Sequence, residues 1–96
     1  MLIRSQNKEV LVAFEFLPDI EVSGGVISAR RDMGWCCLLG EYSTKAKAMK
    51  VLDMIQEAYS EYQIMLNFSV SYLHEFKEKT DGFAIFQMPE DLEVEA

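Results

Sequence analysis

The stretch LGEYSTKAKAMKVLDMIQEAY, residues 39–59, constrains the fold most, because its apolar residues recur at the spacing of an α-helix. Side chains three and four residues apart share one face of a helix, so this repeat predicts an amphipathic helix that packs against a core. The apolar face consists of Ala48, Val51, Leu52, Ile55, Ala58, Tyr59 and, further on, Tyr62. We predict this helix from residue 44 to about residue 60.

Strand patterns precede the helix. Segments rich in Val, Leu, Ile and Phe occupy residues 9–16, 20–22, 26–31 and 35–39, with a shorter candidate at residues 2–5. Pro18 and the Ser-Gly-Gly turn at residues 23–25 separate them, and Gly40 ends the last one. We predict an antiparallel β-meander over residues 2–39 and a final short strand over residues 83–88, which together with the helix gives an α+β fold.

Residues 63–79 allow two interpretations. Their apolar residues alternate as on a half-buried strand, but several of them also continue the helical repeat. A strand followed by a short helix over residues 72–79 would satisfy both patterns. Around this segment we expect a single α+β domain over residues 1–89, followed by an acidic, disordered tail over residues 90–96.

Composition limits the compartment and the partners. The formal net charge is −7, which disfavours nucleic acid as a partner, and no apolar run is long enough to cross a membrane. The two cysteines, Cys36 and Cys37, are adjacent, so they cannot crosslink distant segments as in small secreted proteins. We therefore expect a cytoplasmic protein.

The start of the helix is a candidate anion site. Helix N-termini carry unpaired N–H groups and a partial positive charge, and hydroxyl and lysine side chains gather here. The candidates are Ser43, Thr44, Lys45, Lys47 and Lys50, joined by Arg30 and Arg31 if the preceding hairpin folds beside them. The sequence GEYSTK is not a P-loop, because it lacks the glycine-rich turn and the Gly-Lys-Ser/Thr ending. In the simpler interpretation, Ser43 or Thr44 caps the helix and the lysines are solvated.

Other reactive residues do not form a predicted site. Adjacent strand residues point to opposite faces, so Cys36 and Cys37 fit small strand residues, at least one of them buried, better than a metal or redox pair. His74 is the only histidine and has no recognisable catalytic partners. Most aromatic residues are predicted to lie in the core rather than in a base-stacking surface. We predict no catalytic residues, no cofactor and no metal site.

Three blocks of the sequence carry a resemblance. LIRSQNKEVLV near the start, LGEYSTKAKAMKVLDMIQEAY in the middle and FQMPEDLEVE near the end together span about half of the chain. They resemble a set of small uncharacterised proteins from Gram-positive bacteria and their prophages. The resemblance implies a cytoplasmic bacterial or phage-related protein with a sheet followed by a helix, and it implies no catalytic residues.

These observations favour a non-enzymatic interaction or accessory protein that acts through its surface on a protein partner or as a homodimer. One alternative is a small anion or nucleotide-ligand binder that uses the helix start from Ser43 to Lys50. A second alternative is an enzyme whose site is completed between subunits. A chain of this size leaves little room for an enclosed pocket, which is why we place the interaction protein first.

Overall fold

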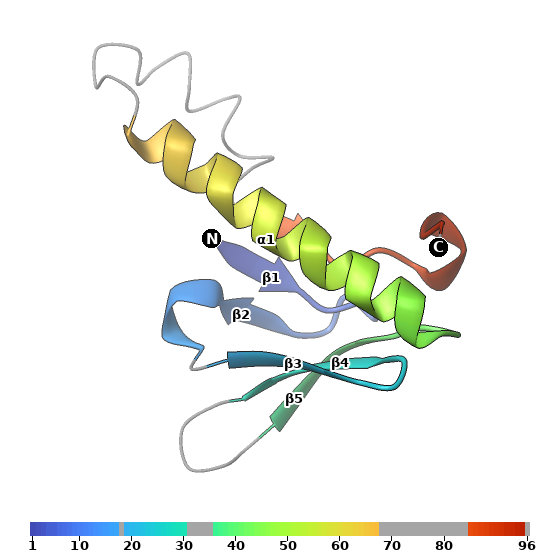
Figure 1. The fold of residues 1–96 in the computed structure, drawn as a ribbon. Helices are drawn as coiled ribbons and strands as arrows, with labels where there is room; N and C mark the ends of the chain where they lie inside the picture. Colours follow the sequence, from blue (N-terminus) through green and yellow to red (C-terminus); the bar gives the residue numbers. More distant parts are fainter. Residues whose placement is uncertain (18, 31–35, 68–84, 96) are drawn as a thin grey trace.

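The structure is a computed structural model that describes residues 1–17, 19–30, 36–67 and 85–95, and it confirms the α+β class. Within these residues one long helix, α1 (Lys45–Asn67), packs against two three-stranded sheets. Figure 1 shows α1 lying across the strands, with the C-terminal turn beside the first residues of the helix.

The first sheet contains β1 (Leu2–Arg4), β2 (Leu11–Ala13) and β6 (Ile85–Gln87). β1 is the central strand, antiparallel to β2 and parallel to β6. The turn between β1 and β2 is held by side chains: the Ser5 hydroxyl accepts a 3.0 Å hydrogen bond from the Val10 N–H, and the side-chain amide oxygen of Asn7 accepts one from the Glu9 N–H. Short polar side chains of this kind stabilise tight turns by replacing backbone acceptors.

The second sheet is an antiparallel meander of β3 (Asp19–Ser23), β4 (Val26–Arg30) and β5 (Cys36–Glu41). Gly24 adopts a φ of +59° in the turn between β3 and β4, as predicted for the Ser-Gly-Gly sequence. Gly25 is needed for a different reason, because a Cβ there would overlap the backbone carbonyl of Tyr42.

The strands differ from the predicted single meander in two ways. After β2 the chain enters a short 3-10 helix, η1 (Phe14–Phe16), so the first two strands belong to a separate sheet that β6 completes. Gly40 does not end a strand: β5 continues through it to Glu41, and the pairing with β4 shifts register at Ile27 and Ser28. A side chain at position 40 would press on the Tyr42 ring, so glycine allows this close contact.

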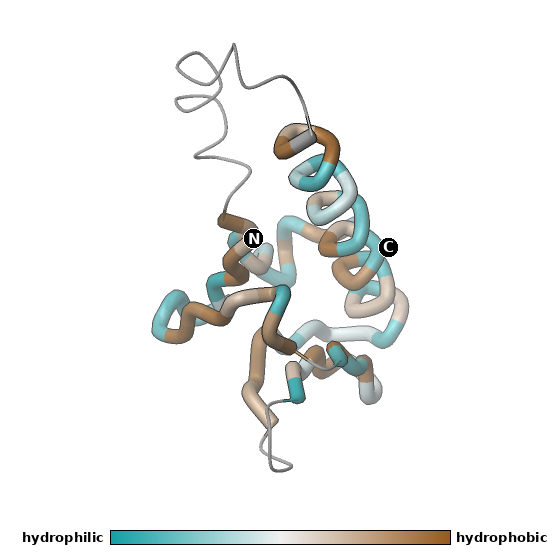
Figure 2. The backbone as a smooth tube through the Cα atoms, turned by 90° about the vertical axis from the view of Figure 1, so that its left-hand side faces the viewer, coloured by the Kyte–Doolittle hydropathy of each residue, from teal (hydrophilic) through white to brown (hydrophobic). Residues whose placement is uncertain are grey.

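The predicted helix is confirmed, and it runs further than predicted, to Asn67. Residues 63–67 are helical, and the rest of the ambiguous segment, residues 68–79, lies outside the described residues. In Figure 2 the tube of α1 changes between hydrophobic and hydrophilic colours along its turns, as an amphipathic helix does. The core residues are Met1, Ile3, Val12, Ile27, Ala29, Leu39, Tyr42, Ala48, Val51, Ile55, Met88 and Val94.

The C-terminal segment differs from the disordered tail that we expected over residues 90–96. In the structure, residues 91–93 form a 3-10 turn, η4 (Asp91–Glu93), which Glu90 and Glu93 close with a reciprocal capping box. Val94 is only 5% exposed and joins the core. An apolar anchor and polar contacts with the helix start fix residues 90–95, despite the acidic composition.

Candidate functional site

The start of α1 confirms the predicted cap. The Thr44 hydroxyl oxygen accepts a 3.1 Å hydrogen bond from the Lys47 N–H, which is the contact that an N-cap side chain makes with the third helical residue. Of the two hydroxyl residues proposed as caps, Thr44 is therefore the one that caps the helix.

The neighbouring backbone group is bound by a carboxylate from the same chain. The Ser43 N–H donates a 2.7 Å hydrogen bond to Asp91 Oδ1. Lys47 Nζ lies 3.4 Å from Asp91 Oδ2 and donates to the Asp91 carbonyl oxygen at 3.1 Å. The chain thus places its own anion at the positive end of α1, where helix dipole and lysine both favour negative charge.

These contacts change the acidity of Asp91. Its pKa is lowered from the ordinary value, first by the hydrogen bond from the Ser43 N–H and further by the Lys47 ammonium, while partial desolvation opposes the change. Asp91 is therefore ionised at neutral pH, and an external anion at this position would have to displace its carboxylate.

The other predicted site residues are only partly brought together. Lys50 Nζ donates to the Glu95 carbonyl oxygen, so it also meets the C-terminal segment, whereas Lys45 is exposed. Arg30 lies at the far end of β4 from the helix start, about 13 Å along the strand from Val26. It forms ion pairs there with Asp19 and Glu21.

Tyr42 connects the helix start to the C-terminal segment. Its hydroxyl donates a 2.8 Å hydrogen bond to the Pro89 carbonyl oxygen, and the residue is 5% exposed. Burial, followed by the negative charges of Glu90, Asp91 and Glu93, raises the pKa of Tyr42 to about 12. The phenol is therefore protonated at neutral pH and acts as a structural donor.

The two cysteines do not form a metal or redox site within the described residues. Cys36 is exposed and Cys37 half-buried, which corrects the expectation that at least one of them is buried; both are free thiols. No group of His, Cys, Asp or Glu in the described part of the chain is arranged to hold a metal ion. Arg31 and His74 lie outside the described residues.

The aromatic residues are divided between core and surface. Tyr42 belongs to the buried core, and Phe14 and Tyr59 stack on each other with ring centroids 4.3 Å apart. Phe16, by contrast, is 84% exposed on η1. Tyr42 is thus the one fully buried aromatic among the described residues, while Phe14 and Tyr59 are half-buried against the core. Trp35, Phe68, Tyr72, Phe76 and Phe83 lie outside the described residues, so the prediction that most aromatics are core residues stays a prediction for them.

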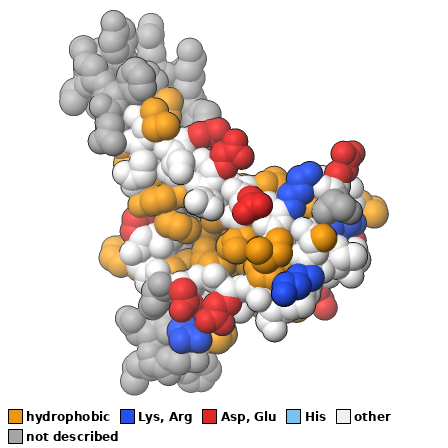
Figure 3. Space-filling view, viewed as in Figure 1, with side chains coloured by type: hydrophobic (Ala, Val, Ile, Leu, Met, Phe, Trp, Pro, Cys, Tyr) orange, Lys and Arg blue, Asp and Glu red, His pale blue; other side chains and the backbone are white. Residues whose placement is uncertain are grey.

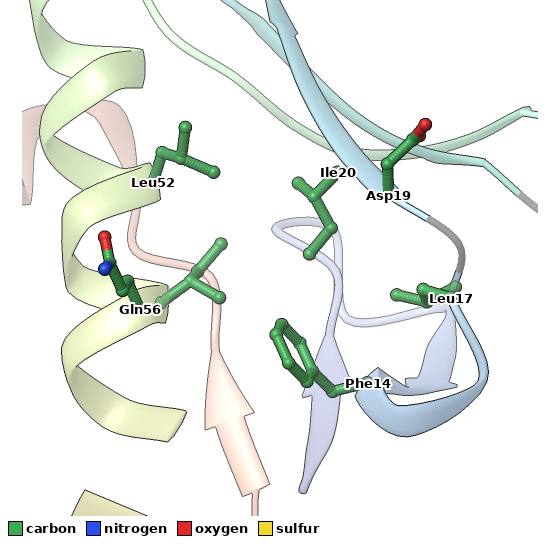
Figure 4. Close-up of a pocket in the computed structure, with 7 residues that line it drawn as sticks. Phe14, Leu17, Asp19, Ile20, Leu52 and Gln56 are labelled. Carbon is green, nitrogen blue, oxygen red and sulfur yellow. The ribbon is translucent and has the colours of Figure 1, made fainter. Parts of the chain in front are cut away.

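An apolar groove lies between α1 and the η1–β3 connection, and sequence reasoning missed it. Its volume is about 340 Å³, and it is partly open to solvent. The lining residues are Phe14, Leu17, Asp19, Ile20, Leu52, Ile55 and Gln56. Figure 4 shows Leu52 and Ile20 facing each other across the groove, Phe14 pointing into it, and the Asp19 carboxylate pointing away from it.

No sequence signal marks this groove, because its two walls come from separate segments. Phe14, Leu17 and Ile20 have the composition of ordinary strand residues, and Leu52 and Ile55 belong to the predicted core face of the helix. The groove exists because the fold brings α1 beside η1 and the start of β3. Of the three helical residues that line the groove, Gln56 is the polar one, and its side chain is exposed beside the apolar Leu52 and Ile55.

Comparisons with known proteins add no further assignment: no family model, curated protein or solved structure matches this chain. Within the described residues, no helix has the length and apolar character that spanning a membrane requires.

Proposed function

We propose that this chain is a non-enzymatic interaction protein, cytoplasmic and of bacterial or prophage origin, that binds an apolar segment of a partner protein. The open groove between α1 and the η1–β3 connection carries the proposal. Its apolar lining is half-buried at Phe14, Leu17, Ile20 and Leu52 and fully buried at Ile55. Apolar surface concentrated in this way is typical of protein-binding sites.

The shape of the groove suits side chains of another protein. Its volume of about 340 Å³ is at the lower end for small-molecule sites, and such sites enclose most of their ligand, which an open groove does not. Fully burying one leucine-sized side chain contributes about 1.5–3 kcal/mol, so two anchors contribute about 3–6 kcal/mol before the cost of association. We therefore expect weak, reversible binding.

The proposal is tested by selecting 12-residue peptides from an unbiased display library on the folded protein and then measuring the affinities of synthetic copies. Leu52→Ala removes part of one groove wall, and Leu11→Ala removes an exposed leucine from β2, which does not line the groove. We expect Leu52→Ala to weaken peptide binding by about tenfold or more, from the loss of buried methylene groups. Leu11→Ala should leave the affinity unchanged.

Circular dichroism and thermal melting establish that each variant is folded before its affinity is compared. Gln56→Trp provides a second groove variant, because position 56 is exposed and a large side chain there fills the groove without disturbing the core. If the selected peptides bind both groove variants as well as the original protein, the proposed function is wrong.

A further inference from the structure

One acidic residue of α1, Asp53, borders the helical wall of the groove. Glu57 and Glu61 are also exposed but lie further around the helix, away from Leu52 and Gln56, and no lysine or arginine occurs between residues 51 and 67. Asp53 lies three residues before the groove-lining Gln56, so the two side chains are neighbours on the helix surface.

The opposite wall has one acidic residue, Asp19, at its edge. Glu21 lies two residues further along β3, and both carboxylates project from the face of the strand opposite to Ile20, which faces the groove. Arg30 partly neutralises this pair through contacts of 3.8 Å to Asp19 Oδ1 and 3.0 Å to Glu21 Oε1. Asp19 Oδ1 is nevertheless a buried atom that accepts no hydrogen bond within the described residues. Figure 3 shows hydrophobic side chains in a band between the helix and the lower strands, with acidic side chains on both sides.

The lysines of α1 do not balance these charges, because they occur only in its first two turns. Lys47 and Lys50 are directed to the C-terminal segment, where they meet Asp91 and Glu95. The groove therefore combines an apolar floor with the exposed carboxylate of Asp53 on its helical rim, in a chain whose formal net charge is −7.

We propose that the partner segment bound in this groove is apolar and basic, with hydrophobic side chains on the floor and a lysine or arginine side chain beside Asp53 on the helical rim. This inference rests on the proposed function. Charge complementarity favours such a segment over a second copy of this chain, because two molecules of net charge −7 repel each other. A complementary charge at the rim also speeds association and rejects acidic segments.

The test uses the composition of the library-selected 12-residue peptides and one pair of charge variants. Asp53→Lys reverses a charge on the rim of the groove. Glu9→Lys makes the same change in net charge in a separate hollow beside Arg4 and Lys8. We expect the peptides to combine Leu, Ile or Phe with an excess of Lys and Arg. We also expect Asp53→Lys to weaken their binding by about threefold or more, and Glu9→Lys to have a smaller effect.

Three further outcomes would count against the proposals, and they are distinguishable. Peptides that are acidic or uncharged, but lose affinity with Leu52→Ala and Gln56→Trp, would overturn the basic partner and leave the binding function intact. Equal effects of Asp53→Lys and Glu9→Lys would do the same, because the rim would then have no local role. If no peptide is selected, or if none responds to the groove variants, both proposals are wrong.

Discussion

The carboxylate of Asp91 accepts a 2.7 Å hydrogen bond from the backbone N–H of Ser43, 48 residues away in the sequence. This contact fastens the η4 turn to the first residues of α1, and Lys47 reinforces it from the helix side. The lysines at the helix start, which suggested an external anion, are thus partly explained by contacts within the chain.

Replacing Asp91 by alanine should loosen the C-terminal turn. The Ser43 N–H loses its acceptor and the Lys47 ammonium loses its counter-charge, so the Ser43 amide should exchange with solvent faster and the melting temperature should fall. Amide hydrogen exchange followed by NMR measures the first effect. Asp53→Ala removes an exposed carboxylate from the same helix and should leave Ser43 protected.

Acid should release the same contact. Because the pKa of Asp91 is lowered on folding, the unfolded chain binds this proton more tightly than the folded one. The stabilisation from Asp91 is therefore complete well above the ordinary pKa of 3.8 and is lost as the pH falls through the lower folded value. A carbon-detected NMR titration of the Asp91 carboxyl group should show a midpoint below 3.8, and a midpoint above it would contradict the structure.

Tyr42 should make the free energy of unfolding fall at alkaline pH, whereas Asp91 makes it fall in acid. Its pKa rises from 10.0 to about 12 on folding, so the stabilisation is complete below pH 10 and is lost as the pH rises toward 12. Tyr42→Phe removes the 2.8 Å hydrogen bond to Pro89 and should cost about 0.5–1.5 kcal/mol of unfolding free energy at neutral pH. Ultraviolet titration of tyrosinate, compared between the two proteins, should assign the highest transition to Tyr42.

The two glycines of the β3–β4 turn should respond differently to alanine. Gly24 has open space around it but a φ of +59°, so Gly24→Ala should cost about 1–2 kcal/mol through backbone strain. Gly25→Ala forces a Cβ into the carbonyl oxygen of Tyr42 and should cost more, because the backbone at the helix start has to move. Urea unfolding of both variants gives the comparison; equal costs would mean that the close approach at Gly25 is absent.

Ser43 and Thr44 should differ in their effect on stability, because only the Thr44 side chain caps the helix. Thr44→Ala removes the side-chain acceptor for the Lys47 N–H and should lower the free energy of unfolding by about 1 kcal/mol. Ser43→Ala keeps the backbone N–H that Asp91 binds, so it should change stability little. Thermal melts of the pair test the assignment, and the reverse order of effects would make Ser43 the cap.

The elements that could be predicted are those whose signals are local. The repeat at Ala48, Val51 and Ile55 predicts α1 because its periodicity is contained within the helix itself, and all three residues are buried. The turn at Gly24 was predictable for the same reason, since the need for a positive φ is a property of a single residue.

The features that were missed depend on pairs of distant residues. Nothing in Ile3 or Phe86 indicates that their strands pair in parallel, and nothing in Asp91 indicates that it meets Ser43. The acidic composition of residues 90–96 favoured disorder. Residues 90–95 are nevertheless ordered, because Val94 is buried in the core and Asp91 binds the start of α1. The groove has the same origin, because its walls come from α1 and from η1 and β3, which are distant in the sequence.

The parallel pairing of β1 with β6 has a consequence for the order of folding during synthesis. The β3–β4–β5 meander joins neighbouring segments and can form as soon as they leave the ribosome, whereas β1 needs a strand that is made more than 80 residues later. At about 5–20 residues per second, one edge of β1 waits about 4–16 s for its partner. β1 can pair with β2 in the meantime, so we expect ribosome-bound chains stalled before residue 85 to protect the meander from proteolysis and to protect β1 less than the complete chain does.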